Sequence, residues 1–262
     1  MLAFNHNEFL PVEKLTALAE TEAENYINAS PFAHGVYDNV FSDEILDAVI
    51  AEFNEGQKTW KEYESKYEKK LQMNADINLL PVTRALVHNL NSEPFLRFLE
   101  KLTGIKGLIP DPYLVGGGLH KIPRGGKLGI HVDFNENSVM KVYRRLNILI
   151  YLNKDWKEEY GGHFELWDAN KNACMKKILP VFNRMAIFST TNTSFHGHPE
   201  PLTCPEDRER ISLALYYYTA GERGNQAISN HSTQFLTEDG GREELSTPRP
   251  SLLQRAVNKI LR

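Results

Sequence analysis

The pattern of apolar and polar positions divides the chain into a helical front and a strand-rich remainder. Apolar residues recur at helical spacing in residues 11–29, 42–53 and 81–103, the last stretch holding two short helices. From about residue 105, short apolar or alternating runs are separated by Gly, Pro, Asn and Asp. The pattern predicts strands at 36–41, 105–109, 113–122, 127–133, 143–152, 162–167, 174–180, 184–189 and 210–219.

Helices followed by many short strands predict an α+β, mainly β fold. We expect a double-stranded β-helix (jelly roll) with helices packed outside it, mostly from the N-terminal part. One domain is expected, with a helical part at 1–104, a jelly-roll core at 105–222 and a polar extension at 223–262 that ends in a short helix. Residues 55–72 are dense in charge and predict a solvated helix or loop, or else a mobile segment over a substrate entrance.

Composition narrows the class of protein. The chain has 262 residues, of which 41% are hydrophobic and 24% charged, as in ordinary soluble globular proteins. The net charge of −4 argues against nucleic acid as the main partner, and no apolar run is long enough to cross a membrane. Cys174 and Cys204 have neither disulfide-framework nor zinc-site spacing. With no secretory signal at the start, these features predict a cytoplasmic protein.

The first candidate for chemistry is a His-x-Asp pair in the predicted strand 127–133. On an extended strand, residues i and i+2 point to the same face, so His131 and Asp133 converge. Together they supply two of the three ligands of a 2-His-1-carboxylate site for iron(II). His196 is the candidate third ligand, and His198 competes with it. His-x-Asp by itself is a common tripeptide, so the later residues decide its meaning.

A candidate anion-binding residue starts the strand at 210–219. By strand parity Arg210 shares a face with the small residues Ser212 and Ala214, which leaves room for an anionic ligand. The alternative is an arginine at a strand end that points to solvent. In the strand 143–152, Arg145, Asn147, Leu149 and Tyr151 share the more polar face, while Leu146, Ile148, Ile150 and Leu152 share the other.

Several motifs in this order resemble one family. They are HVD at 131–133, YLNKDW at 151–156, YGGHFELWD at 160–168, RMAIFS before SFHGHPEPL, and RISLALYYYT at 210–219. From about His120 to Thr219 the chain resembles the iron(II)- and 2-oxoglutarate-dependent dioxygenases, and within them the prolyl-hydroxylase-like branch. Each motif is weak alone, and their order makes the resemblance specific.

The resemblance implies a role for each candidate residue. His131, Asp133 and His196 match the iron ligands, with His196 preferred over His198 because a Pro-containing turn follows it. Arg210 and Tyr151 match the residues that hold the distal carboxylate of 2-oxoglutarate. The implied cofactors are Fe(II), 2-oxoglutarate and O2, with ascorbate as a further candidate. A carboxylate at position 133 favours hydroxylation over halogenation.

The sequence leaves the substrate open. The resemblance favours a prolyl 4-hydroxylase-like enzyme acting on a peptide, with release of succinate and CO2. Hydroxylation of a free amino acid or small natural product is the alternative, followed by a non-catalytic jelly-roll binding protein. A cupin-like metalloenzyme without 2-oxoglutarate would recruit further ligands, for which His120 and His163 are the candidates. Asn135 is placed to touch substrate or co-substrate, and Lys127 is expected to reach solvent.

Overall fold

The structure is a computed structural model that describes residues 6–55, 60–74, 76–168, 170, 172–221 and 230–244. The three predicted helical stretches are confirmed, with the last one split in two as expected. A further short helix, α1, precedes them, and single 3-10 turns lie at Asp76–Asn78 and Glu158–Tyr160. The helices are α1 His6–Phe9, α2 Val12–Ile27, α3 Asp43–Glu55, α4 Pro81–Leu90 and α5 Glu93–Thr103.

The helix boundaries follow local chemistry. Pro81 and Pro94 occupy first-turn positions, where a missing N–H costs nothing and the fixed φ suits a helix. Gly104 ends α5 with φ 73° in the left-handed region, which glycine adopts without a Cβ penalty. The expected C-terminal helix at 251–262 lies outside the described residues.

The strands occur where the alternation predicts them, with shifted ends and several additions. The strand expected at 105–109 shortens to two residues, and the one expected at 113–122 begins only at Gly118 because 111–117 form a turn. The strands are β1 His34–Asp38, β2 Lys61–Glu64, β3 Glu68–Met73, β4 Ile109–Pro110, β5 Gly118–Pro123, β6 Lys127–Val132, β7 Glu136–Asn137, β8 Val142–Tyr151, β9 Phe164–Asp168, β10 Ala173–Ile178, β11 Arg184–Ser189, β12 Phe195–His198, β13 Glu209–Thr219, β14 Gln234–Leu236 and β15 Arg242–Glu244.

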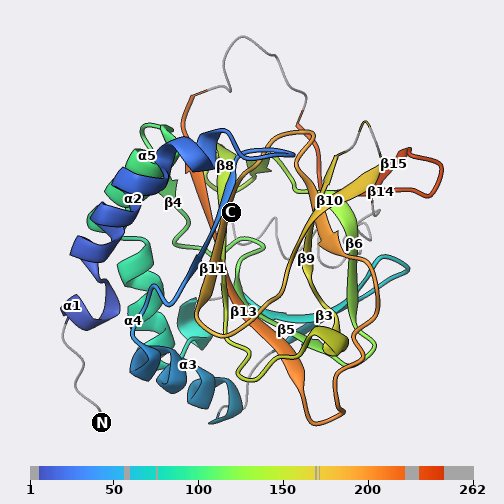
Figure 1. Cartoon of the computed structure of the whole chain (residues 1–262), viewed down its shortest axis with the longest axis horizontal. Helices are drawn as coiled ribbons and strands as arrows, with labels where there is room; N and C mark the ends of the chain where they lie inside the picture. Colours follow the sequence, from blue (N-terminus) through green and yellow to red (C-terminus); the bar gives the residue numbers. More distant parts are fainter. Residues whose placement is uncertain are drawn as a thin grey trace, which may run out of the picture.

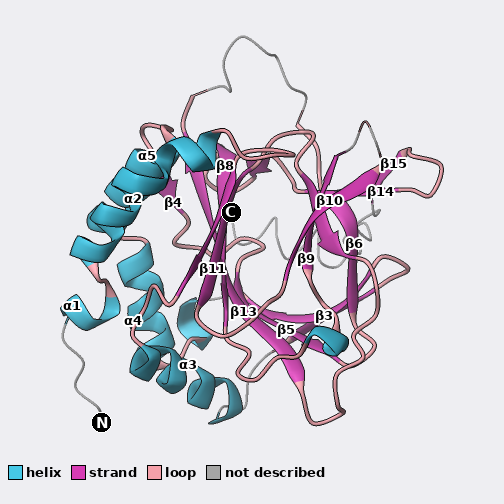
Figure 2. Cartoon of the chain, viewed as in Figure 1, coloured by secondary structure: helices cyan, strands magenta, loops and turns pink. Residues whose placement is uncertain are grey.

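The sheet is antiparallel and curls into a jelly roll, as predicted. Its strand order is β1-β11-β8-β13-β5-β3-β6-β12-β9-β10. The β1-to-β5 end and the β6-to-β10 end form two layers, and β3 joins them by pairing with both β5 and β6. Figure 1 shows the helices gathered on one side of the molecule, beside β8, β11 and β13, and Figure 2 shows the strands occupying the other side.

The two faces of β8 and β13 separate the helical core from the interior of the jelly roll. Leu146, Ile148 and Ile150 are fully buried in the large apolar cluster that includes the residues of the helices, together with Leu213 and Leu215 of β13. The opposite face carries Asn147 and Leu149, and it lines a cavity between the layers. Strand parity therefore assigned these faces correctly.

One residue of β8 departs from that parity. A β-bulge shifts the β8–β13 register, so that Tyr217 pairs with Leu146 while Tyr218 pairs with Arg144. Strict alternation predicted Arg145 on the cavity face, and that prediction is wrong. The extra residue at the bulge turns Arg144 inward, and the Arg145 guanidinium instead donates to the Thr219 hydroxyl at 3.3 Å.

The charged segment 55–72 is neither a helix nor a loop over most of its length. Residues 61–73 form the β2–β3 hairpin, whose second strand enters the sheet. Part of the polar extension also joins the core, because Phe235 of β14 pairs with His131 of β6. Both segments lie outside the core range 105–222 that the sequence predicted.

Candidate functional site

The interior of the jelly roll holds a cavity of about 300 Å³. Its walls come from both layers, from the β2–β3 hairpin and from the β14–β15 hairpin. The lining includes all three predicted metal ligands and Arg210, together with Tyr63, Glu68 and Lys70 of the β2–β3 hairpin and Phe235 of β14. The sequence predicted the first group and offered residues 55–72 as a segment over a substrate entrance, but it predicted neither their hairpin form nor the contribution of β14.

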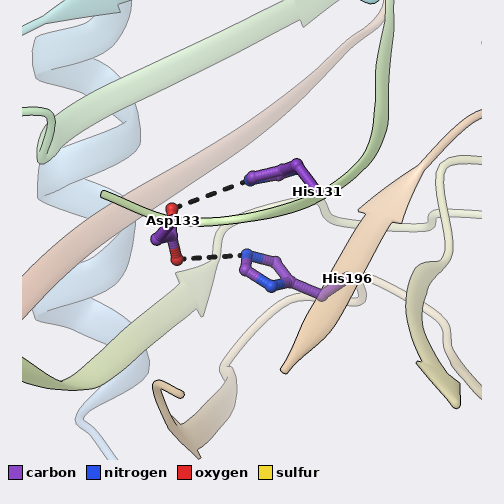
Figure 3. A group of neighbouring side chains, drawn as sticks. All are labelled: His131, Asp133 and His196. Atoms are coloured by element: carbon purple, nitrogen blue, oxygen red, sulfur yellow. Dashed lines mark ion pairs between the residues drawn. The ribbon is translucent and has the colours of Figure 1, made fainter. Parts of the chain in front are cut away.

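His131, Asp133 and His196 converge at one point of this cavity. One ligand atom of each lies within 4.8 Å of the others. His131 and His196 are directly paired across β6 and β12, and Asp133 follows the last residue of β6. Figure 3 shows the two oxygens of Asp133 facing different rings, at 3.7 Å from His131 Nε2 and 3.3 Å from His196 Nε2.

Backbone hydrogen bonds orient both histidines for a metal. His131 Nδ1 lies 2.8 Å from the carbonyl oxygen of Gly129, and His196 Nδ1 lies 2.9 Å from that of Ser194. A carbonyl only accepts, so each Nδ1 carries the proton and each Nε2 presents a lone pair. Two lone pairs and a carboxylate that face one another repel unless a cation lies between them. The donor set therefore fits a divalent metal ion such as iron(II).

Asp133 is held by two residues of β8 that the sequence did not single out for this site. Asn147 Nδ2 donates to Asp133 Oδ2 at 2.7 Å, and Arg144 Nη2 lies 3.2 Å from the same oxygen. Burial opposes ionisation, but the charge of Arg144 outweighs it and holds the pKa of Asp133 well below its usual value. The carboxylate is therefore ionised, with Oδ2 engaged and Oδ1 turned toward His131.

Arg144 is buried among aromatic rings. Its guanidinium lies 3.4 Å from the ring centre of Tyr216 and 4.5 Å from that of Phe134, and it donates from Nε to Asn147 Oδ1 at 2.7 Å. Burial lowers the pKa of Arg144, but the charge of Asp133 more than compensates and raises it. The bulge that turns Arg144 inward depends on strand pairing, so sequence alternation could not reveal it.

Arg210 lies inside the cavity rather than at an exposed strand end. It is 5% exposed and donates from Nε to the carbonyl oxygen of Gly162 at 2.8 Å. Its Nη2 lies 3.4 Å from the Tyr151 hydroxyl. Burial raises the pKa of Tyr151 to about 12, so the phenol is neutral and can donate to an anion or accept from Arg210. No carboxylate pairs with Arg210 among the described ion pairs.

The other candidates have separate positions. His198 and His120 line the cavity but lie outside the three-residue cluster. His163 pairs with Glu158 at 2.8 Å and does not join the cluster either. Asn135 bonds the backbone of His231, so it anchors the C-terminal segment instead of facing the cavity. Lys127 is partly exposed at the start of β6.

The jelly-roll core of the chain matches a known protein family. Residues 117–218 match the family model described as the 2OG-Fe(II) oxygenase superfamily. A prolyl 3-hydroxylase of Mus musculus, OGFOD1, is 28% identical over 79 residues, which are 29% of this chain and 14% of that protein. The chain thus matches a small part of this relative's length.

Solved prolyl hydroxylases share the fold. The enzyme from Trichoplax adhaerens, in complex with a hypoxia inducible factor peptide, superposes with a TM-score of 0.55 at 18% identity, covering 79% of this chain and 92% of that one. A prolyl 4-hydroxylase from Phytophthora capsici gives 0.55 at 21% identity, covering 83% and 67%. Residues 117–218 thus match the 2OG-Fe(II) oxygenase superfamily, and the fold of the chain is prolyl-hydroxylase-like.

Among the residues that the structure describes, no helix combines the length and apolar character that a bilayer crossing requires.

Proposed function

We propose that this protein is an iron(II)- and 2-oxoglutarate-dependent dioxygenase that hydroxylates a prolyl residue of a peptide or protein. One observation carries the proposal. His131, Asp133 and His196 present two imidazole lone pairs and a carboxylate to one point, in the same cavity as the buried cation Arg210. Three protein ligands leave positions open on iron for a chelating co-substrate and O2.

Each residue has a defined task in this proposal. His131, Asp133 and His196 would hold the metal, while Arg210 and Tyr151 would bind the distal carboxylate of 2-oxoglutarate. A guanidinium fixed by Gly162 is suited to that contact because its remaining N–H groups keep a set direction. When bound, iron(II) and 2-oxoglutarate supply the oxidising chemistry: one atom of O2 enters the succinate formed with loss of CO2, and the other enters a C–H bond of the substrate.

The surrounding residues position these groups and exclude water. Arg144 and Asn147 engage Asp133 Oδ2, which leaves Oδ1 for the metal and keeps the carboxylate from turning. The β2–β3 hairpin and β14 cover part of the cavity, and Tyr63 and Phe235 contribute to its lining. A dry site protects an oxidising centre from side reactions.

A prolyl substrate is supported by the relative with which the chain shares sequence, which is named a prolyl 3-hydroxylase. The resemblance of the YLNKDW and Gly-Gly segments to peptidyl prolyl hydroxylases favours a prolyl or peptidyl substrate, and a prolyl 4-hydroxylase is among the proteins that share the fold. We therefore expect 4-hydroxyproline in a protein, and amino acid analysis of the product separates it from the 3-isomer. A mass-spectrometric search for +16 products in cell-extract digests, alongside a panel of free amino acids, tests peptide against small-molecule substrates.

Replacing the metal carboxylate tests the site. Asp133→Ala should reduce succinate release by more than about 100-fold, because it removes a ligand and leaves Arg144 facing an uncompensated site. Succinate is measured against added 2-oxoglutarate, with Asp47→Ala as the control because Asp47 pairs with Lys154 near the surface. Full turnover in Asp133→Ala would contradict the proposed metal site.

Replacing Arg210 tests the binding of 2-oxoglutarate separately from the binding of the metal. Arg210→Ala should raise the apparent 2-oxoglutarate requirement by on the order of 100-fold, because a buried charge-assisted contact is lost. The iron requirement should change little, since Arg210 is not among the three clustered ligands. Equal changes in both requirements, measured by succinate release, would count against this assignment.

Two finer features complete the proposal. Ascorbate is expected to sustain turnover by keeping iron reduced, which a time course with and without ascorbate measures. We propose the cytoplasm as the location, and unpaired Cys174 and Cys204 are compatible with a reducing compartment.

A further inference from the structure

The cavity wall beyond the metal ligands carries an imidazole that the proposed mechanism does not use. His198 is 3% exposed and lines the cavity. Neither of its ring nitrogens has a hydrogen-bond partner among the described residues. A buried polar group without a partner is costly, so such a side chain indicates that a ligand or water completes it.

The charged residues around His198 indicate the charge of that ligand. Arg210 and Lys70 line the same cavity. Lys70 is paired with Glu68 at 2.9 Å, whereas Arg210 has its Nε on the Gly162 carbonyl and no described carboxylate beside it. The uncompensated positive charge at this end therefore favours an anion, and the N–H of a neutral imidazole can donate to it.

The position of His198 along β12 indicates which end of the ligand it contacts. It follows the metal-site residue His196 by two positions, and two strand residues advance about 7 Å. That advance is comparable to the length of a five-carbon dicarboxylate whose other end faces the metal. This spacing would place His198 near the distal carboxylate of such a ligand rather than beside the metal.

A polar row on the opposite layer supports the same assignment. Ser212 of β13 pairs with His120 of β5 on one side and with Tyr151 of β8 on the other, and His120 pairs in turn with Gln72 of β3. Paired residues share a face, so this row crosses four strands toward the cavity. The Nε2 atom of His120 is also buried without a described partner. The co-substrate end of the cavity is therefore polar on both walls.

We propose that His198 is a co-substrate-binding residue that donates an imidazole N–H to the distal carboxylate of 2-oxoglutarate, beside Arg210. This inference rests on the proposed function, because it assumes that 2-oxoglutarate occupies the cavity. His198, which the sequence offered as an alternative to His196 for binding the metal, would then bind the co-substrate instead.

The test measures binding rather than turnover. Calorimetric titration of 2-oxoglutarate into the manganese-loaded protein without O2 should show about tenfold or greater weakening in His198→Val, because a charge-assisted hydrogen bond is lost. His198→Asn, which keeps an N–H donor, should stay closer to the wild type. His88→Val is the control, since His88 is exposed on α4 and pairs with Asp76. Unchanged affinity in His198→Val would overturn the inference.

A second ligand locates the contact. The same titration with 2-oxobutanoate, which keeps the 2-oxo acid and lacks the distal carboxylate, should show no difference between wild type and His198→Val. An equal loss for both ligands would place the contact elsewhere and overturn the assignment.

A third measurement needs no valine variant. In zinc-loaded wild-type protein with ¹⁵N-labelled histidine, 2-oxoglutarate should shift an imidazole resonance that is absent from His198→Asn; no such shift would contradict the inference. Arg210→Ala separates the two proposals. If that variant binds 2-oxoglutarate normally, the proposed co-substrate site fails, whatever His198 does.

Discussion

At the scale of single residues, the direction of Arg210 depends on a glycine. Gly162 has φ +71°, and its carbonyl accepts from Arg210 Nε. A Cβ built there would lie 2.5 Å from Leu202 Cδ2 and 2.9 Å from Arg210 Cδ. The second glycine of the Gly161-Gly162 pair therefore allows the arginine stem to pass close to the backbone.

Gly162→Ala is expected to weaken 2-oxoglutarate binding by about tenfold or more, because the added methyl displaces the Arg210 stem while the left-handed backbone is strained. Binding of manganese should be unchanged. Both affinities can be measured by calorimetry.

The neighbouring glycine offers a matched control. Gly161 also has a positive φ, +69°, but a Cβ there meets nothing within 4 Å. Gly161→Ala should cost about 1–3 kcal/mol of stability, because φ 69° with ψ −151° is a conformation that residues with a Cβ rarely adopt, and leave 2-oxoglutarate binding close to the wild type. Equal loss of binding in both variants would mean that strain, rather than contact with Arg210, is responsible.

At the scale of elements, the β2–β3 hairpin and the β14–β15 hairpin contact each other over β6, the strand that carries His131. The rings of Tyr67 and Phe235 stack with centres 4.6 Å apart, and both lie against Gly129 of β6. Tyr67 and Lys66 also reach Glu243 of β15, each at 2.7 Å. Lys66 and Glu243 are largely exposed, so their ion pair contributes little, and the ring stack is the main contact.

Removing the stack should loosen the β2–β3 hairpin more than removing the charge. Tyr67→Ala is expected to raise amide hydrogen exchange at residues 61–69 by at least about tenfold, since aromatic stacking and buried area are lost. Glu243→Gln should change it less than about threefold. Exchange followed by mass spectrometry measures both, and the reverse order would show that the ion pair holds the hairpins together.

At the scale of the whole molecule, alternation in the sequence predicted most of the jelly roll. It assigned the faces of β8 and β13 because each face meets a different environment, helices on one side and the cavity on the other. The resemblance then selected His131, Asp133, His196, Arg210 and Tyr151, which lie close together in the structure.

The features that the sequence did not predict are those that arise from the pairing of distant strands. Arg144 faces the cavity through a bulge that no local pattern encodes. The β2–β3 hairpin was hidden because its strands are mostly charged, and Leu71 and Gln72 find their partners in β5 far along the chain. β14 is three residues long, too short for any periodicity to be seen.

Metal binding should stabilise the whole fold. At a concentration 100 times its Kd, a divalent ion contributes about 2.7 kcal/mol, which corresponds to roughly 5–10 °C in Tm for a chain of this size. We expect manganese to raise the Tm of the wild type by this amount and that of Asp133→Ala by much less, as scanning calorimetry can show. A chelator should reverse the rise. Equal shifts in both proteins would place the stabilising ion elsewhere.

The pairing of β14 with β6 has a consequence for biosynthesis. Phe235 pairs with His131, and the centres of their rings lie 5.4 Å apart. Phe235 is nevertheless synthesised long after β6, the strand that carries His131. Until then, β6 keeps an unpaired edge beside His131, and Tyr67 lacks the ring on which it stacks. The three proposed metal ligands are therefore synthesised before the segment that covers this edge of β6. Until residues 234–236 pair with β6, His131 is open on that side, so an ion that binds before this pairing and one that binds after it would reach the ligands by different routes.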